Sequence, residues 1–150
     1  MSFEDKIVFH PIGYIKSSAV GNEVNENSAV SQIILKPLLV EALFGLENFS
    51  HIFVLFYFNR VPGEKDLTLK IHPKGRADLP LTGLFGTRTM LRPNPIGLTI
   101  VELLKVEGNT LTVKGLDAFD GTPVLDIKPY DPWDIAKNAR APSWWKKLYE

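Results

Sequence analysis

The run Ser50–Phe58 (Ser-His-Ile-Phe-Val-Leu-Phe-Tyr-Phe) constrains the fold most, because almost every side chain in it is apolar. A strand with one wet face alternates apolar and polar side chains, whereas a continuous apolar run of this length is typical of a strand covered on both faces. The run therefore predicts a strand that is buried on both faces, or a central strand of a closed sheet.

Shorter β-type runs lie on either side of this segment. Further strands are predicted at Lys6–Lys16, kinked at Pro11 and Gly13, and at Ser31–Lys36, Leu67–Ile71 and Pro123–Lys128. Two longer runs, Ile96–Val106 and Thr110–Leu116, flank Gly108-Asn109, a pair that favours a hairpin turn. The pattern predicts six or seven strands.

The remaining segments read as loops and short helices. Residues 17–31 are polar and predict a long loop, and residues 72–97 hold four prolines and four glycines, too many for regular structure. Pro37 suits the first turn of a short helix over Leu38–Phe44, and Pro142–Tyr149 suits a short amphipathic helix. We expect one mostly β domain over residues 1–150, a small single-sheet barrel with its core at about 7–132 and a tail at 133–150.

Composition excludes several kinds of site. The chain has no cysteine, so disulfides, cysteine-based zinc sites and cysteine nucleophiles are ruled out. His10, His51 and His72 are scattered without metal-ligand spacing, and no metal site is predicted. The formal net charge is +0, although residues 72–92 carry four Lys or Arg against one Asp. No apolar run is long enough for a membrane span and the N-terminus does not resemble a signal peptide, so we expect a cytoplasmic protein.

One candidate site is the segment from Gly83 to Gly97. Pro93 and Pro95 restrict their own φ angles and the residues before them, which holds Arg92 and Asn94 extended. The guanidinium groups of Arg88 and Arg92 can grip a carboxylate, a phosphate or a base edge in a bidentate way. The alternative is a rigid crossover loop whose arginines only form ion pairs, and the residues alone leave the two readings equal.

The second candidate is the stretch from Gly115 to Tyr130, which contains Asp117, Asp120 and Asp126. Carboxylates in a turn can bind ribose hydroxyls or a cation, or they can simply cap local backbone N–H groups. Local capping is the better reading for Asp120, which precedes Gly121, whereas Asp117 suits a pocket. Asn59 and Arg60 end the most apolar strand, where a polar pair would lie at a barrel mouth.

Four motifs in order resemble the TsaA-like family, also called TrmO. They are Gly45-Leu-Glu-Asn-Phe-Ser-His51, His72-Pro-Lys-Gly75, Gly83-Leu-Phe-Gly-Thr-Arg88 with Arg92-Pro-Asn-Pro-Ile-Gly97, and Asp117-Ala-Phe-Asp-Gly-Thr-Pro123 with Asp126-Ile-Lys-Pro-Tyr130. The resemblance runs from about Ile12 to Tyr130. It implies a β-barrel methyltransferase that uses S-adenosylmethionine, acts as a homodimer and methylates the exocyclic nitrogen of threonylcarbamoyladenosine next to the tRNA anticodon.

The resemblance also implies a set of cofactor contacts. Carried over by motif, they fall on Asn59, Arg60, Arg88, Leu98, Lys114, Gly115, Leu116 and Asp117. Arg88, Arg92 and Asp117 are the candidate catalytic residues, and no general base is identified. We expect Arg88 or Arg92 to orient the threonyl carboxylate or a phosphate of the anticodon loop.

Two departures from the family pattern leave alternatives open. The loop at residues 18–30 lacks the Pro-x-Gln-type stretch of the family, and Arg88-Thr89-Met90 replaces the usual Arg-Ser-Pro. One alternative is a methyltransferase with another nucleoside or a small molecule as acceptor. The other is a non-catalytic barrel that binds RNA or a ligand.

Overall fold

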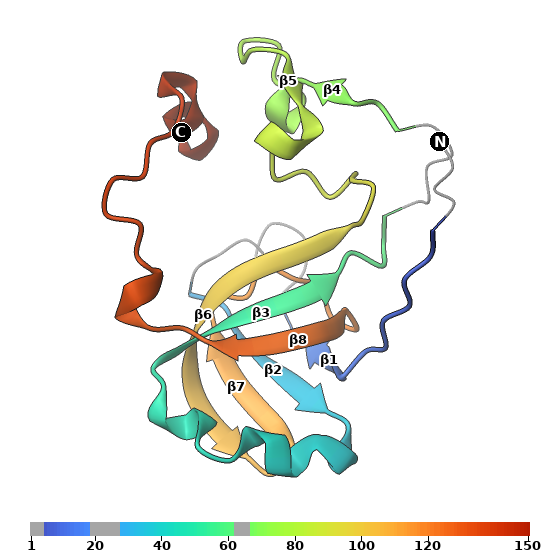
Figure 1. Cartoon of the computed structure of the whole chain (residues 1–150), viewed down its shortest axis with the longest axis vertical. Helices are drawn as coiled ribbons and strands as arrows, with labels where there is room; N and C mark the ends of the chain where they lie inside the picture. The colour runs from blue at the N-terminus through green and yellow to red at the C-terminus, as the bar shows by residue number, and fades with distance from the viewer. Residues whose placement is uncertain (1–4, 19–27, 62–66) are drawn as a thin grey trace.

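Six strands form a closed antiparallel barrel in the computed structural model, which describes residues 5–18, 28–61 and 67–150 (Figure 1). The order around the barrel is β1-β2-β7-β6-β3-β8, with β8 paired back to β1. The strands are β1 (Gly13–Lys16), β2 (Val30–Leu35), β3 (His51–Tyr57), β6 (Ile96–Glu107), β7 (Thr110–Lys114) and β8 (Pro123–Pro129). The mostly β fold and the barrel predicted from the sequence are confirmed.

The barrel interior is filled by alternate side chains of every strand. Ile52, Val54 and Phe56 of β3 are at most 1% exposed. They pack with a cluster from the other strands and from the loop before β8: Ile15, Ile33, Leu35, Val101, Leu111, Val113, Leu116, Ala118 and Val124. The alternation follows from the two-residue period of a strand, which sends successive side chains to opposite faces.

Of the two alternatives predicted for β3, the central strand of a closed sheet is confirmed. The strand pairs with β6 and with β8, whereas on its outer face Phe53 and Leu55 are only half-buried and Tyr57 is 42% exposed. The outer face of the run is therefore only partly covered within a single chain.

Two short helices close the barrel end opposite the long excursion of the chain. They are the 3-10 helices η2 (Pro37–Leu43) and η3 (Leu46–Asn48), joined at Gly45, whose φ of 87° only glycine adopts readily. The first corresponds to the predicted helix at Leu38–Phe44, with Pro37 in its first turn as expected.

The excursion between β3 and β6 forms a small separate lobe, defined here as residues 67–95. It contains a two-stranded sheet of β4 (Lys70–Ile71) and β5 (Thr82–Gly83) and the short 3-10 helices η4 (Pro73–Gly75) and η5 (Leu84–Gly86). The tail, residues 135–150, follows helix η6 (Pro132–Asp134) and ends in helix η7 (Ser143–Tyr149), which lies beside the lobe (Figure 1).

Two predicted strands are shorter than expected. Only Gly13–Lys16 of the run Lys6–Lys16 joins the barrel, and Ile7, Val8 and Phe9 are 78%, 61% and 69% exposed. Ile12 still donates to Val124 O of β8 at 2.8 Å, but Pro11 cannot donate to a ladder and residues 5–11 are not part of a strand. The strand predicted at Leu67–Ile71 is reduced to Lys70–Ile71. None of the helices in the described part of the chain has the length and hydropathy that a membrane crossing requires.

The contact between Gly97 and Phe56 gives a test of the barrel packing. These residues are directly paired between β6 and β3, and a Cβ on Gly97 would lie 2.3 Å from Cε2 of the Phe56 ring. Because the ring is buried and cannot swing away, Gly97→Ala should lower the free energy of unfolding by about 1–3 kcal/mol.

Urea unfolding measures this change. Gly83→Ala is the matched control, since the nearest atom to its added Cβ is a carbonyl oxygen 4.0 Å away. Equal unfolding midpoints for the two variants would contradict the packing described here.

Candidate functional site

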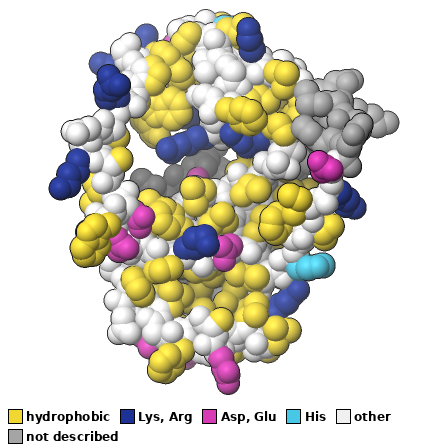
Figure 2. Space-filling view, in the orientation of Figure 1, with side chains coloured by type: hydrophobic (Ala, Val, Ile, Leu, Met, Phe, Trp, Pro, Cys, Tyr) yellow, Lys and Arg dark blue, Asp and Glu magenta, His cyan; other side chains and the backbone are white. Residues whose placement is uncertain are grey.

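One end of the barrel gathers most of the predicted site residues. The end of β3, the start of β6 and the loop of residues 115–122 meet there, and Phe58 N–H donates to Pro95 O at 2.9 Å where the chain leaves for the lobe and returns. Figure 2 shows a hollow between this barrel end and the lobe, with Lys or Arg side chains at its upper edge. Because the lobe leaves and rejoins the barrel at this end, the segment from Gly83 to Gly97 and the loop of residues 115–122 both border this hollow.

The strand end at Arg60 is tied to the 115–122 loop. Arg60 donates to Asp120 O at 2.7 Å, and its guanidinium carbon lies 4.9 Å from the centroid of the Phe119 ring. The Asp120 carboxylate accepts from Ser17 N–H at 2.9 Å, across 103 residues of sequence. Local capping was the wrong prediction for Asp120, because its carboxylate joins the end of β1 to the loop.

Asp117 is presented on the surface of the same loop. Its carboxylate accepts a hydrogen bond from the hydroxyl of Thr99 on β6, and the side chain stays exposed. The neighbours Leu116 and Ala118 are 1% and 4% exposed and anchor the loop in the barrel core. Asp117 is thus held in position, and its carboxylate oxygens can accept further hydrogen bonds from a ligand, as a pocket residue requires.

A shallow hollow lies on the outer surface of the barrel beside this loop. It encloses about 430 Å³ and is lined by His51, Ile100, Glu102, Lys114 and Gly115. The register explains the grouping, because Glu102 of β6 pairs with His51 of β3 on one side and with Lys114 of β7 on the other. A row of three ionisable side chains therefore crosses three adjacent strands.

Leu98 lies on the same outer face and belongs to an apolar strip. The strip consists of three cross-strand pairs between β3 and β6: Phe53 with Ile100, Leu55 with Leu98, and Tyr57 with Ile96. Leu98 is 62% exposed. The strip continues the polar row, so the predicted contacts Leu98, Lys114 and Gly115 border one outer surface. Asp117 instead contacts Thr99, which alternates to the opposite face of β6.

The two candidate arginines of the lobe have different surroundings. Arg92 donates to the carbonyl oxygens of Thr87 at 2.9 Å and Thr89 at 3.2 Å, which ties the loop together. The guanidinium of Arg88 is exposed and lies 5.8 Å from the Trp145 ring of the tail. Of the two, Arg88 keeps more donors available for a ligand, and Arg92 also holds the loop.

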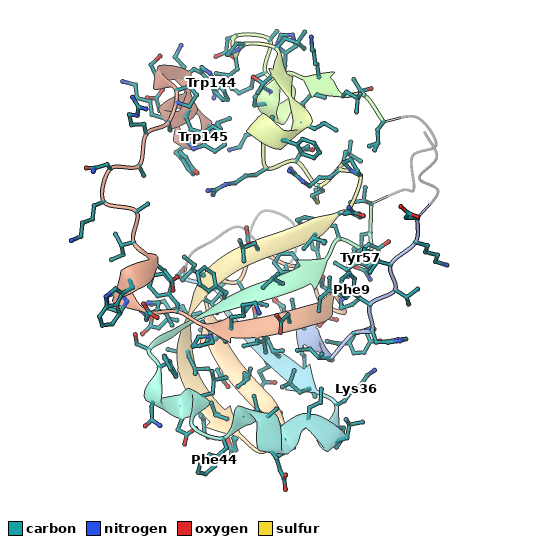
Figure 3. All side chains as sticks on the ribbon, viewed as in Figure 1. Phe9, Lys36, Phe44, Tyr57, Trp144 and Trp145 are labelled. Carbon is teal, nitrogen blue, oxygen red and sulfur yellow. The ribbon has the colours of Figure 1, made fainter. Side chains whose placement is uncertain are left out.

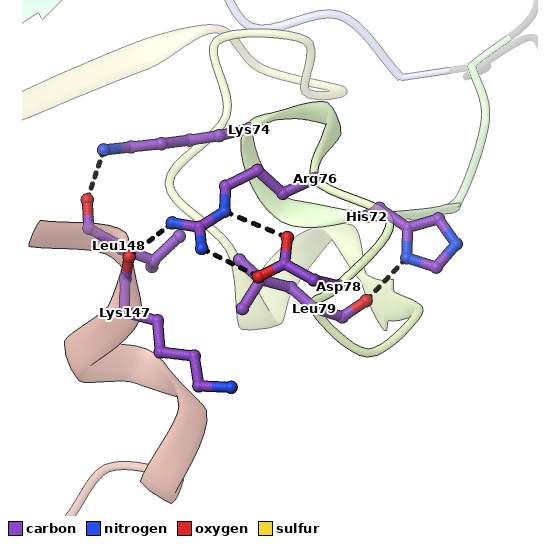
Figure 4. A network of polar contacts seen from close by, with 7 residues as sticks. All are labelled: His72, Lys74, Arg76, Asp78, Leu79, Lys147 and Leu148. Atoms are coloured by element: carbon purple, nitrogen blue, oxygen red, sulfur yellow. Dashed lines mark hydrogen bonds and ion pairs between the residues drawn. The ribbon is translucent and has the colours of Figure 1, made fainter. Parts of the chain in front are cut away.

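Contacts of cationic side chains with main-chain carbonyls hold the tail against the lobe (Figure 4). Lys74 and Arg76 donate to Leu148 O and Lys147 O, each at 2.5 Å, at the end of η7 where carbonyl groups lack helical partners. Arg76 also donates to both carboxylate oxygens of Asp78. These hydrogen bonds lower the pKa of the Asp78 carboxyl and raise that of Arg76. Trp144 and Trp145 lie on the side of η7 that faces the lobe (Figure 3).

The structure brings together most, but not all, of the predicted residues. Asn59 and Arg60 lie at the barrel end where β3 stops, and Asp117 belongs to the loop that is tied to Arg60. Lys114 and Gly115 lie level with Glu102, further along β6, and with His51 at the start of β3, and Arg88 and Arg92 belong to the lobe. Residues 19–27 of the divergent loop fall outside the described part of the chain. Among the described residues, no group of three His, Asp or Glu is placed to hold a metal ion.

Sequence reasoning missed several partners of these residues. Thr99, Glu102, Ile100 and Trp145 contact or adjoin the site but carry no motif of their own. The alternation of the predicted strand at 96–106 could have placed Leu98, Ile100 and Glu102 on one face. No sequence signal could have paired Arg88 with Trp145, because that contact joins segments 57 residues apart.

Comparison with known proteins agrees with this arrangement. The family described as tRNA-methyltransferase O N-terminal domain matches residues 18–134. An S-adenosyl-L-methionine-binding protein of Archaeoglobus fulgidus is 39% identical over 84% of this chain and 91% of its own length. A probable S-adenosyl-L-methionine-binding protein of Methanothermobacter thermautotrophicus is 42% identical over 83% of this chain and 90% of its own length.

Longer proteins match as well. The tRNA (adenine(37)-N6)-methyltransferase of Mus musculus is 40% identical over 83% of this chain, which spans only 31% of the mouse protein. A crystal structure of TrmO superposes with a TM-score of 0.76 at 37% identity, and the match covers 92% of this chain and 64% of that one.

The barrel, the loop that presents Asp117 and the family match over residues 18–134 lead to one assignment: this chain belongs to the family of the tRNA-methyltransferase O N-terminal domain.

Proposed function

We propose that this protein transfers a methyl group from S-adenosylmethionine to the exocyclic nitrogen of an adenosine in tRNA. The observation that carries the proposal is the family match over residues 18–134, shared with relatives named for cofactor binding and for tRNA adenine-N6 methylation. The finer proposal, from the family resemblance, is that the acceptor is threonylcarbamoyladenosine next to the anticodon.

The outer barrel surface suits such a cofactor. S-adenosylmethionine combines an apolar adenine face, ribose hydroxyls, an amino acid group and a sulfonium charge. Leu98 and Ile100 offer apolar contact, the Asp117 carboxylate offers hydrogen-bond acceptors, and Glu102 supplies negative charge. Gly115, with φ at 92°, keeps the backbone beside the hollow free of a side chain. When bound, the cofactor supplies a methyl group activated by the sulfonium.

The residues of this chain would act mainly by positioning. Holding two reacting groups in line removes much of the entropic barrier of a bimolecular step. The acceptor nitrogen is amide-like and a poor nucleophile, so a nearby cation that stabilises developing negative charge would help. Arg88 of the lobe meets this requirement in charge and exposure.

The same surface supports a homodimer, which we propose from the family resemblance. The strip of Phe53, Leu55, Tyr57, Ile96, Leu98 and Ile100 is apolar in every member and uncovered in one chain. A second copy that covers this strip would bury β3 on both faces, as its sequence suggests, and would enclose the open hollow.

A second candidate function has two forms. The protein is either a methyltransferase that acts on another nucleoside or a small molecule, or a non-catalytic barrel that binds RNA or a ligand. It is favoured by the archaeal relatives, which match over about nine-tenths of their length and are named for cofactor binding alone. The methyltransferases named for tRNA are much longer than this chain. Cofactor binding without any action on tRNA would favour this second function.

A thermal melt tests the cofactor site. S-adenosylmethionine at 100 times its Kd adds about 2.7 kcal/mol to the free energy of unfolding. For a chain of this size the Tm should rise by several degrees, at about 2–4 °C per kcal/mol. An unchanged Tm at millimolar cofactor, with tRNA present or absent, would count against both methyltransferase functions and would favour a non-catalytic barrel that binds RNA or another ligand.

Two substitutions should separate cofactor binding from tRNA turnover. Asp117→Asn keeps the acceptor for the Thr99 hydroxyl but removes the charge, and it should raise the Kd for S-adenosylmethionine about tenfold.

Arg92→Ala should lower kcat/KM for tRNA by roughly tenfold to a hundredfold and leave the cofactor Kd within twofold. Isothermal titration and a methyl-transfer assay measure the two effects. Equal losses of both properties in the Arg92 variant would contradict the separation.

The dimer is tested by a charge in the apolar strip. Ile100→Asp should convert a dimer to a monomer in size-exclusion chromatography with light scattering, because it places a carboxylate inside the proposed interface. Leu104→Asp is the matched control on the same strand, since Ile100 and Leu104 are 46% and 47% exposed. A wild-type monomer, or two variants of equal mass, would be evidence against this interface.

A further inference from the structure

The lobe and the tail together concentrate positive charge in a neutral chain. They hold nine Lys or Arg against two Asp or Glu, a net charge of nine minus two, or +7, which leaves −7 on the rest of the chain. The nine are Lys70, Lys74, Arg76, Arg88, Arg92, Lys137, Arg140, Lys146 and Lys147. Figure 2 shows Lys and Arg side chains spread over the lobe and tail and Asp and Glu side chains mainly over the barrel.

Most of these charges are available to a ligand. All except Arg76 and Arg92 are exposed. Within the described part of the chain, the ion pair between Arg76 and Asp78 is the only one in the lobe or the tail. The cations are therefore not neutralised internally, and they form a field that attracts a polyanion.

The tail is fixed to the lobe as one surface. Its last helix accepts hydrogen bonds from Lys74 and Arg76, and its Trp145 ring lies 5.8 Å from the Arg88 guanidinium. The tail cations therefore continue the lobe surface up to Arg88, one of the candidate catalytic residues. The matched family domain ends at residue 134, so the family assignment does not cover the tail.

We propose that the lobe and the tail form one docking surface for the phosphate backbone of tRNA, and that the tail is an essential part of it. The inference rests on the proposed function, because it names the surface that would hold the tRNA substrate. Each phosphate neutralised by Lys or Arg releases condensed counterions, so a surface of this kind gives affinity that depends steeply on salt. The acidic excess of the chain outside the lobe and the tail would repel the same backbone and favour docking on the lobe side.

The test compares two variants that each lose four positive charges. The first is K137Q/R140Q/K146Q/K147Q in the tail. The control is K6Q/K36Q/K105Q/K128Q on the N-terminal segment and the barrel, where all four side chains are exposed. Binding of unmethylated tRNA is measured by fluorescence anisotropy from 50 to 300 mM salt, and the S-adenosylmethionine Kd is measured for each protein.

The tail variant should bind tRNA at least about tenfold more weakly at low salt, and its slope of log K against log salt should be shallower by about 2–4. The control should bind tRNA within about twofold of the wild type, because its four charges lie outside the proposed surface, and the cofactor Kd should be unchanged in both. A tail variant with the affinity and slope of the control would overturn the docking surface while leaving the proposed function intact. A wild type that binds cofactor but not tRNA would overturn the tRNA reading of the function and this inference with it.

Discussion

Closure of the barrel around β3 is the constraint on which the other features of this protein depend. The strand takes hydrogen bonds from β6 on one side and from β8 on the other, and its inward side chains Ile52, Val54 and Phe56 fill the core. Because a closed sheet has no free edge, the excursion of the chain must leave and return at a barrel end. That end is where β3 stops and β6 starts, so the lobe is attached beside the loop that presents Asp117.

The candidate site combines a loop that is anchored in the barrel core with residues of the lobe that contact the tail. Leu116 and Ala118 anchor the Asp117 loop in the core, and Arg60 and Ser17 tie it to neighbouring strand ends through Asp120. Arg88, in contrast, belongs to a lobe with no strand in the barrel, and it contacts the tail through Trp145. The residues proposed to contact the cofactor therefore depend on barrel packing, whereas the residues proposed to contact tRNA depend on the contact between the lobe and the tail.

Charge follows the same division. The lobe and the tail carry a net charge of +7, and the rest of the chain carries −7. The net charge of zero is therefore the sum of two regions of opposite charge. Net charge alone would argue against a nucleic-acid ligand, although the basic bias of residues 72–92 is visible in the sequence. The structure adds the tail to that segment, because Lys74 and Arg76 bond to the carbonyls at the end of η7.

The sequence by itself determined the mostly β barrel, the hairpin at Gly108-Asn109 and the family, because strand periodicity, turn residues and ordered motifs are local properties of the chain. It also singled out Asp117 and Arg88. Only the tertiary structure decided that Thr99 holds Asp117, that Trp145 meets Arg88 and that the outer face of β3 is uncovered within one chain. These facts join residues far apart in sequence or depend on what covers a face, and neither is encoded in the pattern of a single segment. The strand predicted at Lys6–Lys16 was too long for the same reason, because a β-type run becomes a strand only where a neighbouring strand shares its hydrogen bonds.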